Sequence, residues 1–182
     1  MRVSARAEYA CMAIYELAAR LNDGAPTPLH TIATSQGIPN QFLVQILAAL
    51  QKAGLVRSER GPQGGYHLTR NPADITLGEV VKTIDGPLIE LKCLDKEDNL
   101  GCNLEPICSF PPIWQEVQHA MYDVLDRLNF QEIVAKTVAK RAQALAMNYH
   151  PQGRNFPHVP NVPTPSSDGP PEPPSGDPQT HP

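Results

Sequence analysis

Apolar residues recur every three or four positions through the first third of the chain, a spacing typical of amphipathic helices. The first helix is predicted over residues 4–21, with Ser4 as its N-cap. Two more are predicted over residues 29–35 and 39–53, and the glycine-containing turn between them indicates a helix–turn–helix unit. The apolar side chains expected to face inward are Tyr9, Met12, Ala13, Leu17, Leu21, Leu29, Ile32, Ala33, Phe42, Leu43, Ile46, Leu47 and Leu50.

After the third helix the pattern changes to two short runs typical of strands, residues 55–60 and 66–70. The sequence Gly-Pro-Gln-Gly-Gly joins them and predicts a tight turn. A hairpin directly after a candidate recognition helix predicts a winged helix. Long polar side chains on such a wing can contact phosphates or enter the minor groove. The candidates are Arg57, Arg60, Gln63 and Arg70.

Helical spacing returns in residues 75–84, 112–128 and 129–148. In the second of these stretches apolar residues repeat at about 3.5 positions, which is typical of a coiled-coil seam and predicts a dimerisation helix. The seam residues are Ile113, Val117, Met121, Val124 and Leu128. The fold class expected is therefore mainly α with a small β-hairpin wing: a winged helix–turn–helix followed by a long dimerisation helix, assembled as a homodimer.

Composition divides the rest of the chain. Eleven of the 20 prolines fall after residue 150, where almost no apolar side chain is left to form a core. Such a tail is expected to be disordered with polyproline II character. The predicted units are a DNA-binding domain (1–86), a cysteine loop (87–111), dimerisation and C-terminal helices (112–149) and the tail (150–182).

Three of the four cysteines lie in one short loop with the spacing C-x8-C-x5-C: Cys93, Cys102 and Cys108. Neither a signal peptide nor a membrane span is visible, so a cytoplasmic protein with reduced thiols is expected. Clustered thiols in that compartment indicate metal or redox chemistry rather than a disulfide framework. Thiolates suit zinc or an iron–sulfur cluster, and the spacing alone leaves both open.

The net charge of −4 is not typical of a nucleic-acid-binding protein, but the charges are unevenly distributed. Residues 1–92 carry nine Lys and Arg against eight Asp and Glu. Within residues 52–70 four cations face only one acid. Such a patch can bind phosphates, although four cations also occur on an ordinary solvated surface.

Three segments follow one another in a specific order and spacing. The run G-I-P-N-Q-F-L-V-Q-I-L-A-A-L-Q-K-A-G-L-V is followed by R-S-E-R-G-P-Q-G-G-Y-H-L, and I-T-L-G-E-V-V-K-T-I-D-G then leads to the cysteines. In these segments the chain resembles the Rrf-two family of bacterial winged-helix regulators, which includes the IscR, NsrR and RsrR types. The resemblance covers residues 1–148. It implies a homodimer that binds pseudo-palindromic operators in double-stranded DNA, in most members as a repressor.

Many members of this family carry an iron–sulfur cluster that controls DNA affinity. The resemblance places the cluster on Cys93, Cys102 and Cys108, with Glu8 from the partner subunit as the fourth ligand. The histidine that the IscR type uses is replaced by Pro111. That departure favours the NsrR arrangement, with a 4Fe-4S cluster over a 2Fe-2S cluster. Cys11 is a competing ligand, although a buried structural thiol is the role expected for it.

The resemblance also assigns the DNA contacts of the recognition helix. Gln41 falls on a base-reading position, where a glutamine can pair with adenine. Val44 replaces a glutamate of the IscR type and can touch a thymine methyl group. Asn40 and Gln45 are neighbours expected at phosphates, and Arg60 matches the arginine of the wing.

The leading hypothesis is thus a DNA-binding transcriptional regulator whose cluster senses iron, redox state or nitric oxide. The alternative keeps DNA binding but uses the same cysteines for zinc or as a thiol redox switch. An enzyme is not expected, because the sequence has no nucleophile–base constellation, no phosphate-binding loop and no cofactor fingerprint. Neither a small-molecule substrate nor a membrane is an expected partner.

Overall fold

The computed structural model describes residues 3–91 and 107–147. Cys93, Cys102 and the predicted tail of residues 150–182 lie outside the described residues. The helices and strands are α1 (Ala5–Ala19), α2 (Leu29–Gln36), α3 (Asn40–Lys52), β1 (Val56–Glu59), β2 (Gly65–Leu68), α4 (Leu77–Asp85), α5 (Phe110–Asp126) and α6 (Phe130–Ala146). Two 3₁₀ turns are η1 (Leu21–Asp23) and η2 (Pro72–Asp74).

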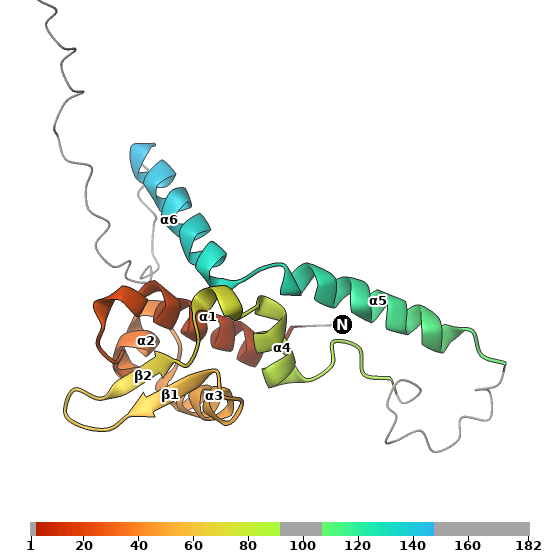
Figure 1. Ribbon diagram of the computed structural model, residues 1–182, viewed down its shortest axis with the longest axis horizontal. Helices are drawn as coiled ribbons and strands as arrows, with labels where there is room; N and C mark the ends of the chain where they lie inside the picture. The colour runs from red at the N-terminus through yellow and green to blue at the C-terminus, as the bar shows by residue number, and fades with distance from the viewer. Residues whose placement is uncertain (1–2, 92–106, 148–182) are drawn as a thin grey trace, which may run out of the picture.

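The helix–turn–helix unit consists of α2 and α3, and both helices pack against α1 (Figure 1). α2 is followed by its C-cap Gly37, whose φ of 65° is the left-handed conformation that glycine adopts without strain. Pro39 then precedes the first residue of α3, Asn40, so the missing proline N–H costs no helical hydrogen bond. The fully buried side chains around this unit include Ile14, Ile32, Leu43, Ile46, Leu47 and Leu50.

β1 and β2 form the predicted antiparallel wing, in which the buried residues Val56 and Leu68 lie opposite each other. The second strand is also fixed to the loop before α2. Thr27 and Tyr66 exchange two backbone hydrogen bonds there, of 3.0 and 2.9 Å. A side chain at Gly65 would overlap the backbone of Thr27, so this close approach requires glycine.

The predicted N-caps of α1, α4 and α6 are confirmed. The hydroxyls of Ser4 and Thr76 each accept a backbone hydrogen bond at 3.1 Å in the first turn of their helix. Asn129 and Glu132 have the predicted capping-box spacing, but the return bond is made by the Asn129 side chain instead of its backbone N–H. The Asn129 side chain accepts from the Glu132 N–H at 2.9 Å and donates to the Glu132 carboxylate at 3.1 Å.

The junction between α5 and α6 is bonded to the segment that opens α4. The Leu77 N–H donates to the Leu128 carbonyl at 2.8 Å, and the Phe130 N–H donates to the Ile75 carbonyl at 3.1 Å. Phe130 is 1% exposed and closes the core at this point. α6 therefore starts against α1 and η2, while α5 leaves the junction in another direction (Figure 1).

α5 projects away from the bundle of α1 to α4, and no residue described in it is buried (Figure 1). It begins and ends slightly earlier than the expected 112–128. Ile113, Val117 and Val124 are 51%, 38% and 59% exposed. Their spacing places them along one face, so a single chain leaves these three residues of the predicted seam uncovered, while Met121 and Leu128 are partly buried. None of the described helices is both long and apolar enough to cross a membrane.

Two residues expected to face inward are instead on the surface, so these predictions were wrong. Leu21 is 47% exposed, because α1 stops at Ala19 and the 3₁₀ turn that follows carries Leu21 off the buried face. Phe42 is 48% exposed. It lies at the edge of the buried stripe of α3, where Leu43 and Ile46 already fill the contact with α1.

Candidate DNA interface and thiol site

The outward face of α3 carries most of the residues expected to read DNA. Gln41, Val44 and Gln45 are exposed, as is Asn40 at the first residue of the helix. Ala48 is exposed on the same face, because it lies four residues after Val44. Sequence reasoning missed Ala48, although continuing the helical spacing by one turn would have included it.

The wing presents its cations in two different ways. Arg57 and Arg60 are exposed, and within the described residues neither side chain forms an ion pair or a hydrogen bond. The Arg70 guanidinium instead donates to the Glu79 carboxylate at 2.6 Å and so ties the end of the wing to α4. Gln63 is exposed at the tip of the hairpin. Two of the three arginines are therefore available to an external anion.

A buried carboxylate holds the helix–turn–helix unit on α1. Glu16 is 0% exposed, and it accepts from Arg20 Nε at 2.5 Å and from Gln36 Nε2 at 2.7 Å. Gln36 is the last residue of α2, so this network fixes the turn that precedes the recognition helix. A buried charge needs such partners, because leaving it unpaired would cost several kcal/mol (on the order of 3–5). Sequence reasoning did not single out Glu16.

Of the three clustered cysteines, the described residues include only Cys108. It is a free, half-buried thiol two residues before the start of α5. Within residues 3–91 and 107–147 no three His, Cys, Asp or Glu side chains come close enough together to hold a metal ion. The structure thus neither assembles the expected ligand set nor separates it, because Cys93 and Cys102 lie outside the described part.

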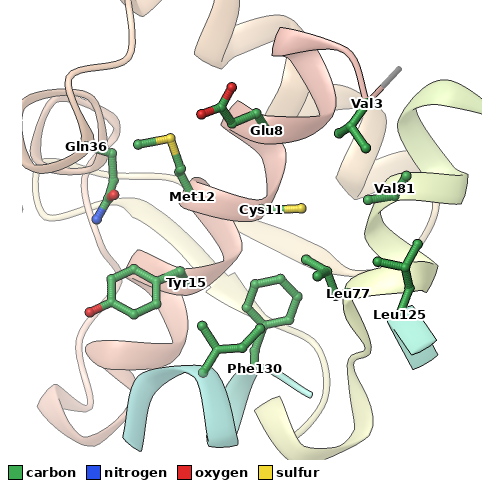
Figure 2. A pocket seen from close by; sticks show the side chains of 11 residues that line it. Val3, Glu8, Cys11, Met12, Tyr15, Gln36, Leu77, Val81, Leu125 and Phe130 are labelled. Atoms are coloured by element: carbon green, nitrogen blue, oxygen red, sulfur yellow. The ribbon is translucent and has the colours of Figure 1, made fainter. Parts of the chain in front are cut away.

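Glu8, the expected fourth ligand, lines a cavity of about 460 Å³ between α1, α4 and the α5–α6 junction (Figure 2). Cys11 and Met12 of α1, Val81 of α4 and Phe130 of α6 line the same space. The Glu8 side chain is exposed, and no ion pair or side-chain hydrogen bond engages it among the described residues. Its carboxylate is therefore open to a ligand from outside the chain.

Burial raises the pKa of the Cys11 thiol from 9.0 to about 12, and the negative charges of Asp85 and Glu8 add to this effect. At neutral pH the thiol keeps its proton. The thiolate is the form that binds metals and attacks disulfides, so a protonated thiol is suited to packing. Its position against the hydrophobic core agrees with the structural role expected for it.

Tyr122 of α5 holds the backbone at the start of the cysteine loop (residues 87–111). Its hydroxyl donates to the Gly86 carbonyl at 3.3 Å and accepts from the Leu88 N–H at 3.2 Å. The Lys82 ammonium lies 5.7 Å from the centre of the tyrosine ring, within the range of a cation–π contact. Gly86 terminates α4. The first residues after α4, which lead towards Cys93, are therefore hydrogen-bonded to α5. No local pattern in the sequence indicates this contact.

These elements define a winged helix–turn–helix protein extended by two long helices. Residues 3–136 match the family Rrf2, the Rrf-two family, described as an iron-dependent transcriptional regulator. A Mycobacterium tuberculosis protein named as an HTH-type transcriptional regulator is 34% identical over 152 residues, which are 84% of this chain and 92% of that protein. IscR of Aliivibrio salmonicida is 34% identical over 134 residues, or 74% of this chain and 77% of IscR.

Solved structures agree with these relatives. IscR of T. potens superposes with a TM-score of 0.59 at 30% identity and covers 75% of this chain and 88% of its own. CymR, the global cysteine regulator of B. subtilis, also has a TM-score of 0.59, at 28% identity, and covers 75% and 98%. The chain belongs to the Rrf2 family of transcriptional regulators. The expected family and the expected winged-helix fold are confirmed, whereas the expected homodimer is not tested by a single chain. The relatives of this chain are named as transcriptional regulators, not as enzymes.

Proposed function

We propose that this chain is a transcriptional repressor that binds a pseudo-palindromic operator. The observation that carries DNA binding is the exposed outward face of α3 beside a wing with two uncommitted arginines. The recognition helix enters the major groove, and the wing lies along the backbone or in the minor groove. The residues assigned to the DNA are Asn40, Gln41, Val44, Gln45, Arg57, Arg60 and Gln63.

The acting form is a homodimer joined through α5. A row of exposed apolar residues on a projecting helix is unfavourable in water unless a partner covers it. The partner of a symmetric dimer presents the same row, so one seam can cover the other. The two recognition helices then meet half-sites related by the same two-fold axis. In this arrangement residues 1–86 bind DNA and residues 112–149 hold the dimer together.

A metal centre on Cys93, Cys102 and Cys108, with Glu8 of the partner subunit, controls DNA affinity in this proposal. Three thiolates and a carboxylate suit an iron–sulfur cluster, with 4Fe-4S favoured over 2Fe-2S. The description of the Rrf2 family as iron-dependent and the similarity to IscR support iron. The unengaged carboxylate of Glu8 supports its role as a ligand. When bound, the cluster supplies redox chemistry and a sensitivity to iron supply or nitric oxide.

The contacts of Asp85 and Tyr122 connect the cysteine loop (residues 87–111) to the DNA-binding unit, so a change in the loop can alter the position of that unit. Asp85 bonds to Ser4 at the start of α1, and Tyr122 bonds to Gly86 and Leu88 from α5. α1 in turn holds α2 and α3 through their shared core. A ligand that orders the cysteine segment in one arrangement therefore shifts the population of α1 and α5 positions that suit the operator.

The second candidate keeps the same DNA-binding unit but uses the cysteines for zinc or as a thiol switch. The similarity to CymR, a cysteine regulator, supports the version in which thiol chemistry of the cysteines controls DNA binding. Zinc is tetrahedral and accepts a set of three thiolates and one carboxylate.

Metal analysis separates these candidates. The full-length protein is purified without oxygen, and iron, sulfide and zinc are measured together with visible absorption. A coloured protein with matched iron and sulfide, which Cys102→Ala abolishes and Glu8→Ala weakens, supports the cluster. Colourless protein with stoichiometric zinc contradicts the cluster and leaves the second candidate. Loss in Cys102→Ala but not in Glu8→Ala moves the fourth ligand elsewhere, with Cys11 as the next variant to test.

A further inference from the structure

We propose that α3 is a reader of adenine–thymine pairs and that Val44 and Ala48 contact thymine methyl groups in the major groove. This inference rests on the proposed DNA-binding function and names the bases that the recognition helix selects. Ala48 enters as a new contact residue. The argument uses the exposed face of α3, the chemistry of its side chains and the cations of the wing.

Two stripes of α3 have the same spacing and lie on opposite sides of the helix. The buried stripe consists of Leu43, Ile46, Leu47 and Leu50. The exposed stripe has the same i, i+3, i+4, i+7 spacing two positions earlier and consists of Gln41, Val44, Gln45 and Ala48. Because the first stripe faces α1, the second faces away from the domain and presents one continuous surface.

From Gln41 to Ala48 the exposed stripe contains no charged group. Lys52, four residues after Ala48 and the last residue of α3, is the only charged residue in the helix and lies at its C-terminal end. Specific contacts to guanine are most often made by arginine or lysine, and contacts to the cytosine amino group by glutamate or aspartate. Between Gln41 and Ala48 the stripe offers no arginine or lysine for guanine and no glutamate or aspartate for cytosine. Its two glutamines, Gln41 and Gln45, have the carboxamide that pairs with the adenine N6 and N7 atoms.

The two remaining positions of the stripe are apolar. Val44 is 51% exposed, and Ala48 is exposed one turn further along. Thymine is the only standard base with a methyl group in the major groove, and an aliphatic side chain recognises that group by excluding water from it. Ala48 has a short side chain, so the helix backbone can approach the base pairs closely there. Alternating carboxamides and aliphatic groups therefore match adjacent adenines and thymines.

The wing supports the same base composition. Arg57 and Arg60 have no partner among the described residues, and their guanidinium groups are exposed. Runs of adenine–thymine pairs narrow the minor groove, and the stronger negative potential there attracts arginine. An operator rich in such pairs would thus suit the wing as well as the recognition helix.

The test begins with selection of sites by the full-length chain from a pool of random DNA duplexes. Each thymine of the selected half-site is then replaced singly by 2′-deoxyuridine, which removes only the methyl group. We expect adenine–thymine half-sites and, at the thymines facing Val44 and Ala48, an affinity loss of about fourfold per methyl group. Val44→Ser, which replaces the aliphatic group by a hydroxyl, should abolish the uracil penalty at one of these positions and leave it at the other.

Phe42→Ala is the matched control, because Phe42 is equally exposed and apolar but lies off the stripe. The uracil penalties should be unchanged in this variant. Guanine–cytosine half-sites, or selected sites whose affinity is unaffected by every uracil, would overturn the inference and leave the proposed function standing. A chain that selects no DNA sequence at all would refute both.

Discussion

Ser4 and Asp85 are 81 residues apart in the chain, yet Asp85 accepts two hydrogen bonds from Ser4. The backbone N–H of Ser4 donates to one carboxylate oxygen at 2.8 Å and its hydroxyl donates to the other at 2.5 Å. The same hydroxyl caps α1. The start of α1 and the end of α4 are therefore one hydrogen-bonded unit, and the segment with the cysteines leaves from it.

We expect Ser4→Ala and Asp85→Asn each to lower the free energy of unfolding by about 1–2 kcal/mol, as loss of a cap or of a charge-assisted hydrogen bond does. The double variant should lose less than the sum, because both changes break the same contact. Denaturant unfolding measures all three. Asp123→Asn is the control, since Asp123 is exposed and its side chain forms no hydrogen bond or ion pair among the described residues. Additive losses would show that the pair does not act as a unit.

Glu16→Ala should be among the more damaging single changes. It leaves the Arg20 guanidinium and the Gln36 amide without their buried acceptor, and we expect a loss of about 3–5 kcal/mol in unfolding free energy. Glu132→Ala removes a half-exposed carboxylate that pairs with Lys136 and accepts from the Asn129 side chain, and should cost about 1 kcal/mol or less. Similar losses in the two variants would contradict the structural role assigned to Glu16.

The arginines of the wing should separate in their effect on DNA binding. Arg57→Ala and Arg60→Ala should weaken binding and each reduce the slope of log affinity against log salt by about one, as loss of a phosphate contact does. Arg70→Ala should leave that slope unchanged, because Arg70 is engaged by Glu79. Affinities measured at several salt concentrations give the slopes. An equal change of the salt slope in all three variants would contradict the distinction between free Arg57 and Arg60 and engaged Arg70.

Tyr122→Phe removes a hydroxyl that bonds to the backbone at both Gly86 and Leu88. We expect a loss of about 1 kcal/mol in unfolding free energy and faster hydrogen exchange at the Leu88 amide, whose acceptor is lost. Tyr9→Phe is the control, because the Tyr9 hydroxyl makes no hydrogen bond within the described residues. Unchanged exchange at Leu88 would mean that the anchor is not formed in solution.

Cys11 should make stability depend on alkaline pH. Its pKa in the folded chain is about 12, above the ordinary value of 9.0, so the native state keeps the proton that the unfolded chain loses. This contribution to stability is complete below pH 9 and disappears as the pH rises towards 12. The destabilisation caused by Cys11→Ala should therefore be smaller at pH 10.5 than at pH 8. A pH-independent difference between the two proteins would contradict the raised pKa.

Much of the architecture was predictable because its causes are local. Helical spacing located the helices, and the caps at Ser4, Thr76 and Asn129 depend on side chains that bond to backbone only three residues away. The hairpin followed from a glycine-rich turn between two short strands. The prediction failed for Leu21 because the helical spacing does not extend that far. Leu21 lies beyond the last turn of α1, so its side-chain direction is not set by the helix.

In the candidate site, too, some features follow from the sequence and others depend on tertiary contacts. The exposed positions Gln41, Val44 and Gln45 follow from the helical period, since the stripe opposite a buried one faces solvent. The availability of Arg57 and Arg60, in contrast to Arg70, does not follow from sequence. All three are cations at the wing, and only the approach of Glu79 from α4 distinguishes the third.

By itself the sequence therefore determined the order of the elements, the caps, the inward faces apart from Leu21 and Phe42, and the family of the protein. Tertiary structure alone decided how those elements are joined: Ser4 with Asp85, Glu16 with Gln36, and Tyr122 with the backbone of Gly86 and Leu88. Each of these contacts joins residues from different elements. A polar side chain has many equally suitable partners in the sequence, and only packing of the apolar faces brings one of them within hydrogen-bonding distance.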